Sequence, residues 1–281
     1  MRDCLYTSNI RSLARRLGVI KLVTMPRRLR QTRLEDQFKR QPVSQVRVRL
    51  GSVDVDAMVS SAGEYARIIS TQNDNHLIAA LERYATRERA VFWDIGANIG
   101  LYSIAMAKLL KDGGGKVIAF EPEPRSALRL KQNLALNQID NVFLEPVALG
   151  AEDGMASLSV NEAAHAGSHS LVAHAEPSNQ TVAITVTTGS TLVREHSISQ
   201  PTFSKIDVEG FEARVIEGMI DEIKNPHFEA ILCEVHFSLL EKSGQHDIPR
   251  WIVSTLIECG LINIVWMDSS HLLATRHSAA A

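Results

Sequence analysis

The sequence has little of what marks several large classes of protein. None of its apolar runs approaches the roughly 20 residues that a membrane-spanning helix requires. It holds three cysteines in 281 residues, Cys4, Cys233 and Cys259, without disulfide or zinc-ligand spacing, which predicts buried thiols in a reducing compartment. The net charge of -2 argues against a dedicated nucleic-acid-binding protein. The hydrophobic content of 45% is enough for the core of one large domain.

Positive charge is concentrated at the start of the chain. The first 40 residues hold eleven Lys or Arg and three acidic residues. Leu13, Leu17 and Ile20 alternate there with basic residues, which predicts a basic amphipathic helix. Such a helix can rest on an anionic membrane surface or act as a transit peptide, but we favour a solvated extension, as is usual at chain termini. We therefore separate residues 1–45 as a basic helical extension and expect a cytoplasmic protein that can contact a membrane through it.

Residues 46–87 predict a β-hairpin and a helix that lead into the core. Two alternating stretches, 46–50 and 53–57, flank Gly51-Ser52, and a two-residue loop with glycine first is typical of a type II′ hairpin. We expect this hairpin to cover one side of the main sheet, with Arg–Asp pairs across its solvated face. Asp74 is the predicted N-cap of the helix that follows.

The rest of the chain is organised around residues 91–100, VFWDIGANIG. Its apolar start predicts a strand buried on both faces, and its two glycines predict a loop before a helix at 102–109. This is half of a nucleotide-binding unit, because Gly96 lets a ligand approach the main chain and the helix amides point at the same place. Asn98 replaces the middle glycine of the dinucleotide fingerprint, and the carboxylate of Asp94 suits a ligand with a cationic head.

The second half of the unit follows at once. Residues 116–120 predict the next strand, which ends at Glu121-Pro122. An acidic residue about 20 positions after a glycine loop is where a ribose diol is held. Pro122 stiffens the turn and removes a donor.

Strands continue to alternate with helices, which predicts an α/β fold with a mostly parallel sheet and helices on both faces. Ser126 and Gly210 are predicted to open the helices after the second and fourth strands. The fourth sheet strand with its loop is predicted at residues 203–210, and the other strands at 142–144, 230–236, 261–266 and 271–275.

An insertion interrupts this alternation, with two further strands predicted at 155–160 and 181–187. The segment between them, residues 161–180, is expected to form a mobile loop over the substrate pocket. It holds three histidines but no carboxylate or cysteine at ligand spacing, so we predict no metal site from His165, His169 and His174.

Ionisable residues gather at the predicted carboxyl ends of the strands. Ligands of open parallel sheets bind outside those ends. Each residue taken alone is explained as well by capping or ion pairing, but together they predict a functional site. The set is Asp94, Glu121, Asp207, Glu209, Glu234 and His236.

The motifs DIGANIGLYS, VIAFEPEP, VALG, KIDVEGFE and ILCEVH follow one another in this order. They resemble the FkbM-type methyltransferase family, within the Rossmann-like enzymes that use S-adenosylmethionine. The likeness covers about residues 88–275 and departs from the usual loop at Trp93, where phenylalanine is common. It implies a Rossmann-like methyltransferase domain at 88–276, with a seven-stranded sheet whose last strand is antiparallel, and a short tail at 277–281.

The resemblance also implies roles for the residues at the strand ends. The loop after the first sheet strand is implied to line the methionine end of the cofactor, and Glu121 to hold its ribose hydroxyls. Asp207 is implied to face both the methyl donor and the acceptor. The implied cofactor-binding set is Asp94, Gly96, Asn98, Gly100, Glu121, Pro122, Ala148 and Asp207.

The expected chemistry follows from the methyl donor. A methyl sulfonium is already activated, so the enzyme must mainly align donor and acceptor. A hydroxyl acceptor must lose its proton as it attacks, and His236 is the candidate base because histidine titrates near neutrality. A structural histidine bonded to Asp207 or Glu234 is the alternative. The predicted catalytic set is His236, Asp207 and Glu209, and the resemblance implies O-methylation of a small molecule, sugar or glycolipid.

Other activities fit the residues less well. A nicotinamide-dependent oxidoreductase should show three glycines in the first loop. A nucleic-acid base methyltransferase usually carries Asn or Asp before Pro-Pro-aromatic after the fourth strand, where this sequence has Asp207-Val208-Glu209-Gly210. A magnesium-dependent catechol-type transferase would offer an Asp-Asn pair. A non-catalytic nucleotide-binding module of the same fold remains the alternative that only an activity measurement excludes.

Overall fold

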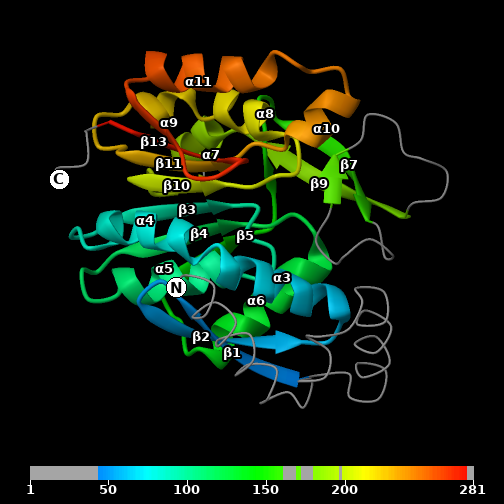
Figure 1. The fold of residues 1–281 in the computed structure, drawn as a ribbon, viewed down its shortest axis with the longest axis vertical. Helices are drawn as coiled ribbons and strands as arrows, with labels where there is room; N and C mark the ends of the chain where they lie inside the picture. The colour runs from blue at the N-terminus through cyan, green and yellow to red at the C-terminus, as the bar shows by residue number, and fades with distance from the viewer. Residues whose placement is uncertain (1–43, 161–168, 172–179, 196–197, 277–281) are drawn as a thin grey trace, which may run out of the picture.

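The computed structural model describes residues 44–160, 169–171, 180–195 and 198–276, and it places a seven-stranded sheet between two layers of helices (Figure 1). Six strands run in the same direction, and β13 is antiparallel to both of its neighbours. The predicted seven-stranded α/β sheet with a reversed last strand is therefore confirmed. In spatial order the strands are β12 (Asn263–Trp266), β13 (His271–Thr275), β11 (Ala230–Glu234), β10 (Phe203–Ile206), β3 (Val91–Ile95), β4 (Lys116–Phe120) and β5 (Val142–Glu145).

Alternate side chains of the central strands enter two separate cores. Phe92 faces one core and lies 4.8 Å from Phe203, ring centroid to ring centroid, while Trp93 faces the other core and lies 5.0 Å from Phe120. All five residues of β3 are buried. A strand that is apolar on both faces lies in the middle of the sheet. The carboxyl end of β3 is therefore at the centre of the sheet edge formed by the strand ends.

The helices before and between the first strands cover one face. The β1–β2 hairpin packs on this helix layer, against α5 and α6, and not on the sheet as predicted (Figure 1). Its predicted turn and Arg–Asp pairs are confirmed, because φ is positive at Gly51 alone in the turn and Arg47 pairs with Asp56. The elements are β1 (Ser44–Leu50), β2 (Val53–Val59), α3 (Ala62–Asn73), α4 (Asn75–Ala85), α5 (Leu101–Leu110) and α6 (Pro124–Leu136).

The later helices cover the opposite face, where Val215, Ile252 and Leu256 meet the second core. Gly260 ends the last helix with φ +94°, as predicted. Gly210 precedes the helix of its segment by two residues, and the predicted single helix is broken in two near Gly218. The elements are α7 (Gly189–Glu195), α8 (Glu212–Glu217), α9 (Ile220–Lys224), α10 (Phe237–Lys242) and α11 (Ile248–Glu258).

The insertion forms a second, four-stranded sheet beside the main one (Figure 1). Both predicted strands are confirmed in β7 (Gly154–Val160) and β9 (Gln180–Thr187), with β6 (Ala148–Leu149) and β8 (His169–Leu171) added. The predicted loop, including His165 and His174, lies outside the described residues except for β8. So do the basic extension, apart from its last two residues, and the tail.

One predicted helix cap is confirmed in its position, the other is wrong, and one helix is missing from the prediction. Asp74 stands at the N-cap of α4 but makes no capping hydrogen bond, and Glu123, not Ser126, caps α6. The unpredicted helix α3 has Ser61 as its N-cap, and the Ser61 hydroxyl accepts from the backbone amide of Glu64.

Cys233 and Cys259 are buried free thiols, as expected. Among the described residues, no helix is both long and apolar enough to cross a membrane.

Candidate active site

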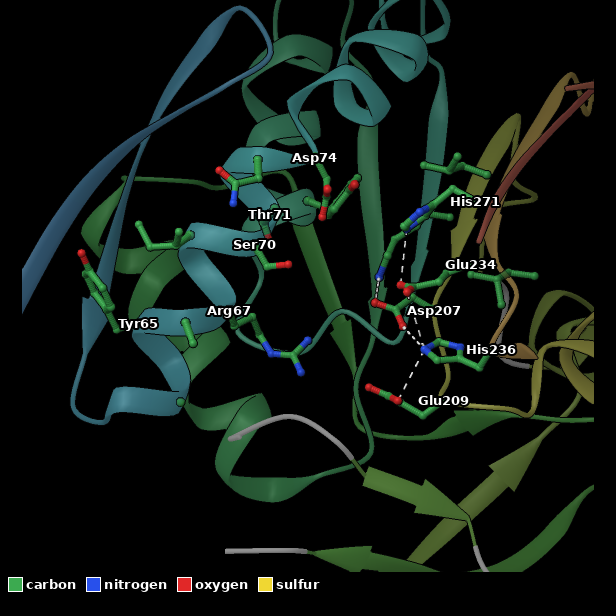
Figure 2. Close-up of a pocket in the computed structure, with 18 of the residues that line it drawn as sticks. Tyr65, Arg67, Ser70, Thr71, Asp74, Asp207, Glu209, Glu234, His236 and His271 are labelled. Atoms are coloured by element: carbon green, nitrogen blue, oxygen red, sulfur yellow. Dashed lines mark ion pairs between the residues drawn. The ribbon is translucent and has the colours of Figure 1, made fainter. Parts of the chain in front are cut away.

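A cavity of about 610 Å³ opens at the carboxyl edge of the parallel strands. One of its walls is a face of α3, from which Arg67 points across the cavity towards the opposite wall (Figure 2). That wall is built by the ends of β10, β11 and β13. The charged residues of that wall are Lys205, Asp207, Glu209, Glu234, His236 and His271, while Arg67 and Asp74 line the cavity from the α3 side.

A smaller cavity adjoins the larger one. Arg67, Asp207 and Glu209 line both, so these three residues mark the junction. The smaller cavity combines apolar and polar lining residues, a combination suited to a flat base with a hydroxylated sugar. Gly96, Asn98 and Glu121 lie together as its polar end, and the apolar lining includes Phe120, Val147, Leu149, Leu158, Ile184 and Phe211.

The turn between β3 and α5 shapes the polar end. Gly96 has φ +76°, and a Cβ there would lie 1.9 Å from the backbone oxygen of Asp207. The glycine is therefore required by the close approach of the neighbouring strand end, in addition to the ligand access that we predicted. Asn98 also has a positive φ, and its amide donates to Glu121 Oε2 at 2.7 Å. The amide of Glu123 donates to the other oxygen at 2.8 Å.

Lys205 is the cation beneath the junction. Its Nζ donates to the carbonyl of Gly96 at 3.0 Å and lies 3.5 Å from Asp94 and 3.4 Å from Asp207. Burial opposes the charge, but Asp207, Asp94 and Glu234 raise the pKa of Lys205. Burial likewise opposes the charge of Asp207, yet Lys205 and Arg67 hold the pKa of Asp207 below its usual value. Both side chains are thus charged at neutral pH.

His236 lies among four carboxylates, of which Figure 2 shows Asp207, Glu209 and Glu234; the fourth belongs to Glu212. Its Nδ1 is 2.7 Å from Glu212 Oε1, and its Nε2 is 3.4 Å from Glu209, 3.7 Å from Glu234 and 3.8 Å from Asp207. Burial alone would lower the pKa of His236, but the hydrogen bond and charge of Glu212, with Asp207 and Glu234, raise it to about 9. The imidazole is therefore cationic at neutral pH in this arrangement.

Part of this cluster has the spacing of a cation site. One potential ligand atom from each of Asp207, Glu209 and His236 lies within 4.8 Å of the others. A metal ion bound there would have to displace the proton of His236 and break its ion pairs with these acids. We assign no metal to the cluster, and the absence of a metal stays a prediction.

Comparison with known proteins gives the decisive match. The family model of the FkbM methyltransferase domain matches residues 94–260. The hexuronic acid methyltransferase AglP of Haloferax volcanii is 28% identical over 178 residues, which are 63% of this chain and 69% of AglP. The chain belongs to the FkbM methyltransferase family. It is a methyltransferase, and S-adenosylmethionine is its cofactor.

Solved methyltransferases resemble this FkbM chain only distantly. The FkbM structure from Methylobacillus flagellatus has a TM-score of 0.42 and 15% identity, covering 73% of this chain and 54% of that one. This chain therefore spans about half the length of that protein. Precorrin-6y C5,15-methyltransferase from Geobacter metallireducens has a TM-score of 0.41 and 15% identity, covering 72% and 89% respectively.

The smaller cavity suits the cofactor of an FkbM methyltransferase. The Glu121 carboxylate is buried at its polar end, beside the main chain of Gly96 and Asn98. Of the predicted cofactor-binding set, six residues line this cavity: Gly96, Asn98, Glu121, Pro122, Ala148 and Asp207. The other two line neither cavity. Asp94 is fully buried and accepts from Ser103 Oγ at 2.5 Å, and Gly100 packs on Leu130.

The predicted catalytic residues are brought together, and three neighbours were missed. Asp207, Glu209 and His236 meet at the junction, as their strand-end positions predicted. Arg67, Lys205 and Glu212 received no role from the sequence. The spacing of Ser61 and Glu64 is a capping-box signal that marks the start of α3, and so could have placed Arg67 on a helix.

Proposed function

We propose that this methyltransferase methylates a hydroxyl group of a sugar-like acceptor, either free or carried by a lipid. The larger cavity carries the proposal. Its wall holds four carboxylates, two imidazoles and the hydroxyls of Ser70, Thr71 and Tyr102, which offer the many hydrogen-bond partners that a polyhydroxylated ligand needs. The similarity to AglP, a hexuronic acid methyltransferase, supports a carbohydrate acceptor.

We assign the cofactor to the smaller cavity, with its ribose hydroxyls on Glu121 and its sulfonium near the junction. Gly96, Asn98, Pro122 and Ala148 form the surrounding wall. Asp94 acts from behind this wall, because it holds Lys205 and Ser103 in place. Gly100 acts by fixing the turn.

The chemistry at the junction requires alignment and one proton transfer. When bound, the cofactor supplies an electrophilic methyl group on a sulfonium cation. Asp207 and Glu209 offset that positive charge and orient the acceptor. His236 accepts the hydroxyl proton on Nε2 while the acceptor oxygen forms its bond to the methyl carbon and the carbon–sulfur bond breaks. Because a further positive charge beside Asp207 lowers the proton affinity of His236, the imidazole moves towards the neutral form that a base requires.

The test is transfer of labelled methyl from S-adenosylmethionine to a panel of acceptors: neutral hexosides, hexuronic acid glycosides and extracted glycolipids. We expect label in one carbohydrate class, stable to alkali, because a methyl ether resists the hydrolysis that removes a methyl ester. His236→Gln should lower turnover about 10²-fold or more, as loss of a general base does, with nearly unchanged cofactor affinity. His227→Gln, an exposed site at the other end of β11, is the matched control.

Three results would contradict this function. Alkali-labile label would place the methyl group on a carboxylate, which needs no base. Equal loss of turnover and cofactor affinity in His236→Gln would make His236 structural. Cofactor binding by calorimetry without transfer to any acceptor of the panel or a host extract would favour a binding module.

A further inference from the structure

Glu212 has no part in the mechanism above, although it makes the shortest contact of His236 within the cluster. It is the first residue of α8 and is fully buried. Its Oε1 lies 2.7 Å from His236 Nδ1 and accepts from the amide of Gly210 at 2.9 Å. Through these two contacts one carboxylate oxygen joins the imidazole to the turn that carries Glu209.

We infer that Glu212 is the positioning residue of a Glu212–His236 pair, and that it fixes Nε2 of His236 as the atom that receives the acceptor proton. The inference rests on the proposed function, since it deepens the role of His236 in it. Glu212 does not line either cavity, so it acts through His236 and not on the acceptor.

The geometry determines which ring nitrogen is free. A carboxylate only accepts hydrogen bonds, so Nδ1 of His236 must carry the proton that Glu212 receives. In neutral imidazole the lone pair is then on Nε2. Nε2 faces Glu209, Glu234 and Asp207, which line the larger cavity. A buried carboxylate behind a histidine base sets the tautomer in the same way in hydrolytic triads.

The burial of Glu212 supports a functional role. Its second oxygen, Oε2, has no hydrogen-bond partner among the described residues. A buried carboxylate with an unsatisfied oxygen costs stability, and an apolar side chain of similar size would pack there at lower cost. A catalytic pair with His236 would explain why this cost in stability is tolerated.

The pKa of His236 depends on every charged group around the imidazole. Glu212 faces it from α8, Asp207 and Glu209 from the loop after β10, and Glu234 from the end of β11. Behind these carboxylates lie Arg67 of α3, Lys205 of β10 and His271 of β13. A base must be deprotonated, so turnover should rise with pH through the pKa of His236. Removing the Glu212 charge lowers that pKa, so the rising limb should move to lower pH.

The kinetic test is the pH profile of kcat for Glu212→Gln. We expect the alkaline plateau to fall about 10²-fold, and the rising limb to move down by about one pH unit or more. The Kd for S-adenosylmethionine and the KM for the acceptor should stay within about twofold of wild type. Glu217→Gln, an exposed position on the same helix, should change none of these values. A parallel loss of turnover and cofactor binding, with the limb unmoved, would make Glu212 structural and overturn the inference.

A second measurement needs neither activity nor a Glu212 variant. Long-range proton–nitrogen NMR of the wild-type protein, with His236 assigned by His236→Gln, reports which ring nitrogen is protonated. Above pH 9 we expect a proton on Nδ1 and none on Nε2. A proton on Nε2 in the neutral ring would overturn the pair even if methyl transfer proceeds. Loss of turnover on chelation that Mn²⁺ restores would also overturn it, because Nε2 would then be a metal ligand.

Discussion

Glu121 links cofactor affinity to pH. Burial raises the pKa of Glu121 to about 7, although the amides of Asn98 and Glu123 favour its charged form. Ribose hydroxyls donate to an ionised carboxylate, so affinity should fall as the group takes up a proton. We predict that the Kd for S-adenosylmethionine rises about tenfold from pH 8 to pH 6, measured by calorimetry. Glu121→Gln should bind weakly at both pH values, and a flat wild-type profile would refute the role.

Glu121→Gln should weaken cofactor binding but increase folding stability at alkaline pH. The folded-state pKa of Glu121 lies above the ordinary value, so its contribution to stability is greatest in acid and is lost as pH rises through about 7. Glu121→Gln should therefore unfold at higher denaturant concentration than wild type at pH 8, though not at pH 4. A loss of stability at pH 8 would mean that the backbone contacts outweigh the burial.

Residue types at strand ends were predictable, but their partners were not. Asp207 and His236 each follow a predicted strand, and parallel strands bring their ends together. Lys205 lies inside β10, and from the sequence alone it could equally have been a lysine of an exposed edge strand. Only its contact with Asp94 on the neighbouring strand explains its burial. Glu212 was hidden for the same reason, because its contact spans 24 positions in sequence.

At the scale of elements, the turn after β3 tolerates no side chain at Gly96. Gly96→Ala would add the cost of a positive φ to a clash with the backbone of Asp207. Gly114 has φ +67°, and a Cβ added there would meet nothing within 4 Å. Gly114→Ala therefore measures the cost of the positive φ alone, about 1–2 kcal/mol. We predict from denaturant unfolding that Gly96→Ala costs at least about 2 kcal/mol more than this control. Equal costs would show that the strand end can move aside.

Helix α3 is tied to the rest of the structure by Arg129 of α6. Its Nε lies 2.9 Å from Glu64, and another guanidinium nitrogen lies 2.6 Å from Ser60 Oγ; the Arg129 and Glu64 side chains are largely buried. Arg129→Ala should loosen the acceptor wall and raise the acceptor KM several-fold, with cofactor Kd unchanged. Arg214→Ala, which breaks an exposed pair with Glu217, is the control. A rise in both constants would indicate general destabilisation.

Strands were easier to predict than this helix. The apolar runs of β3, β4 and β11 are buried on both faces, and their composition predicts them as strands. Helix α3 buries only Ile68 fully, so it has almost no apolar period. Its polar residues face the cavity instead. Asp74 stands at its predicted N-cap position, but it lines the cavity and makes no capping hydrogen bond.

For the whole molecule, the topology followed from the alternation of strands and helices, while the acceptor cavity did not. Its wall combines α3 with the ends of β10, β11 and β13, which are about 200 positions apart at the extremes. The hairpin was misplaced for a related reason. Its alternating pattern shows that one face is buried, but not whether a sheet or a helix layer buries it.

The boundary of the family match divides this cavity. The match begins at Asp94, whereas α3 ends at Asn73. The motifs that handle the methyl donor and half of the wall that meets the acceptor are therefore encoded in separate stretches of the gene. Mutation can alter acceptor choice through α3 while the donor machinery is inherited intact. Members of the family that share every motif can thus diverge in substrate, and a shared motif set identifies the reaction more securely than the molecule that receives the methyl group.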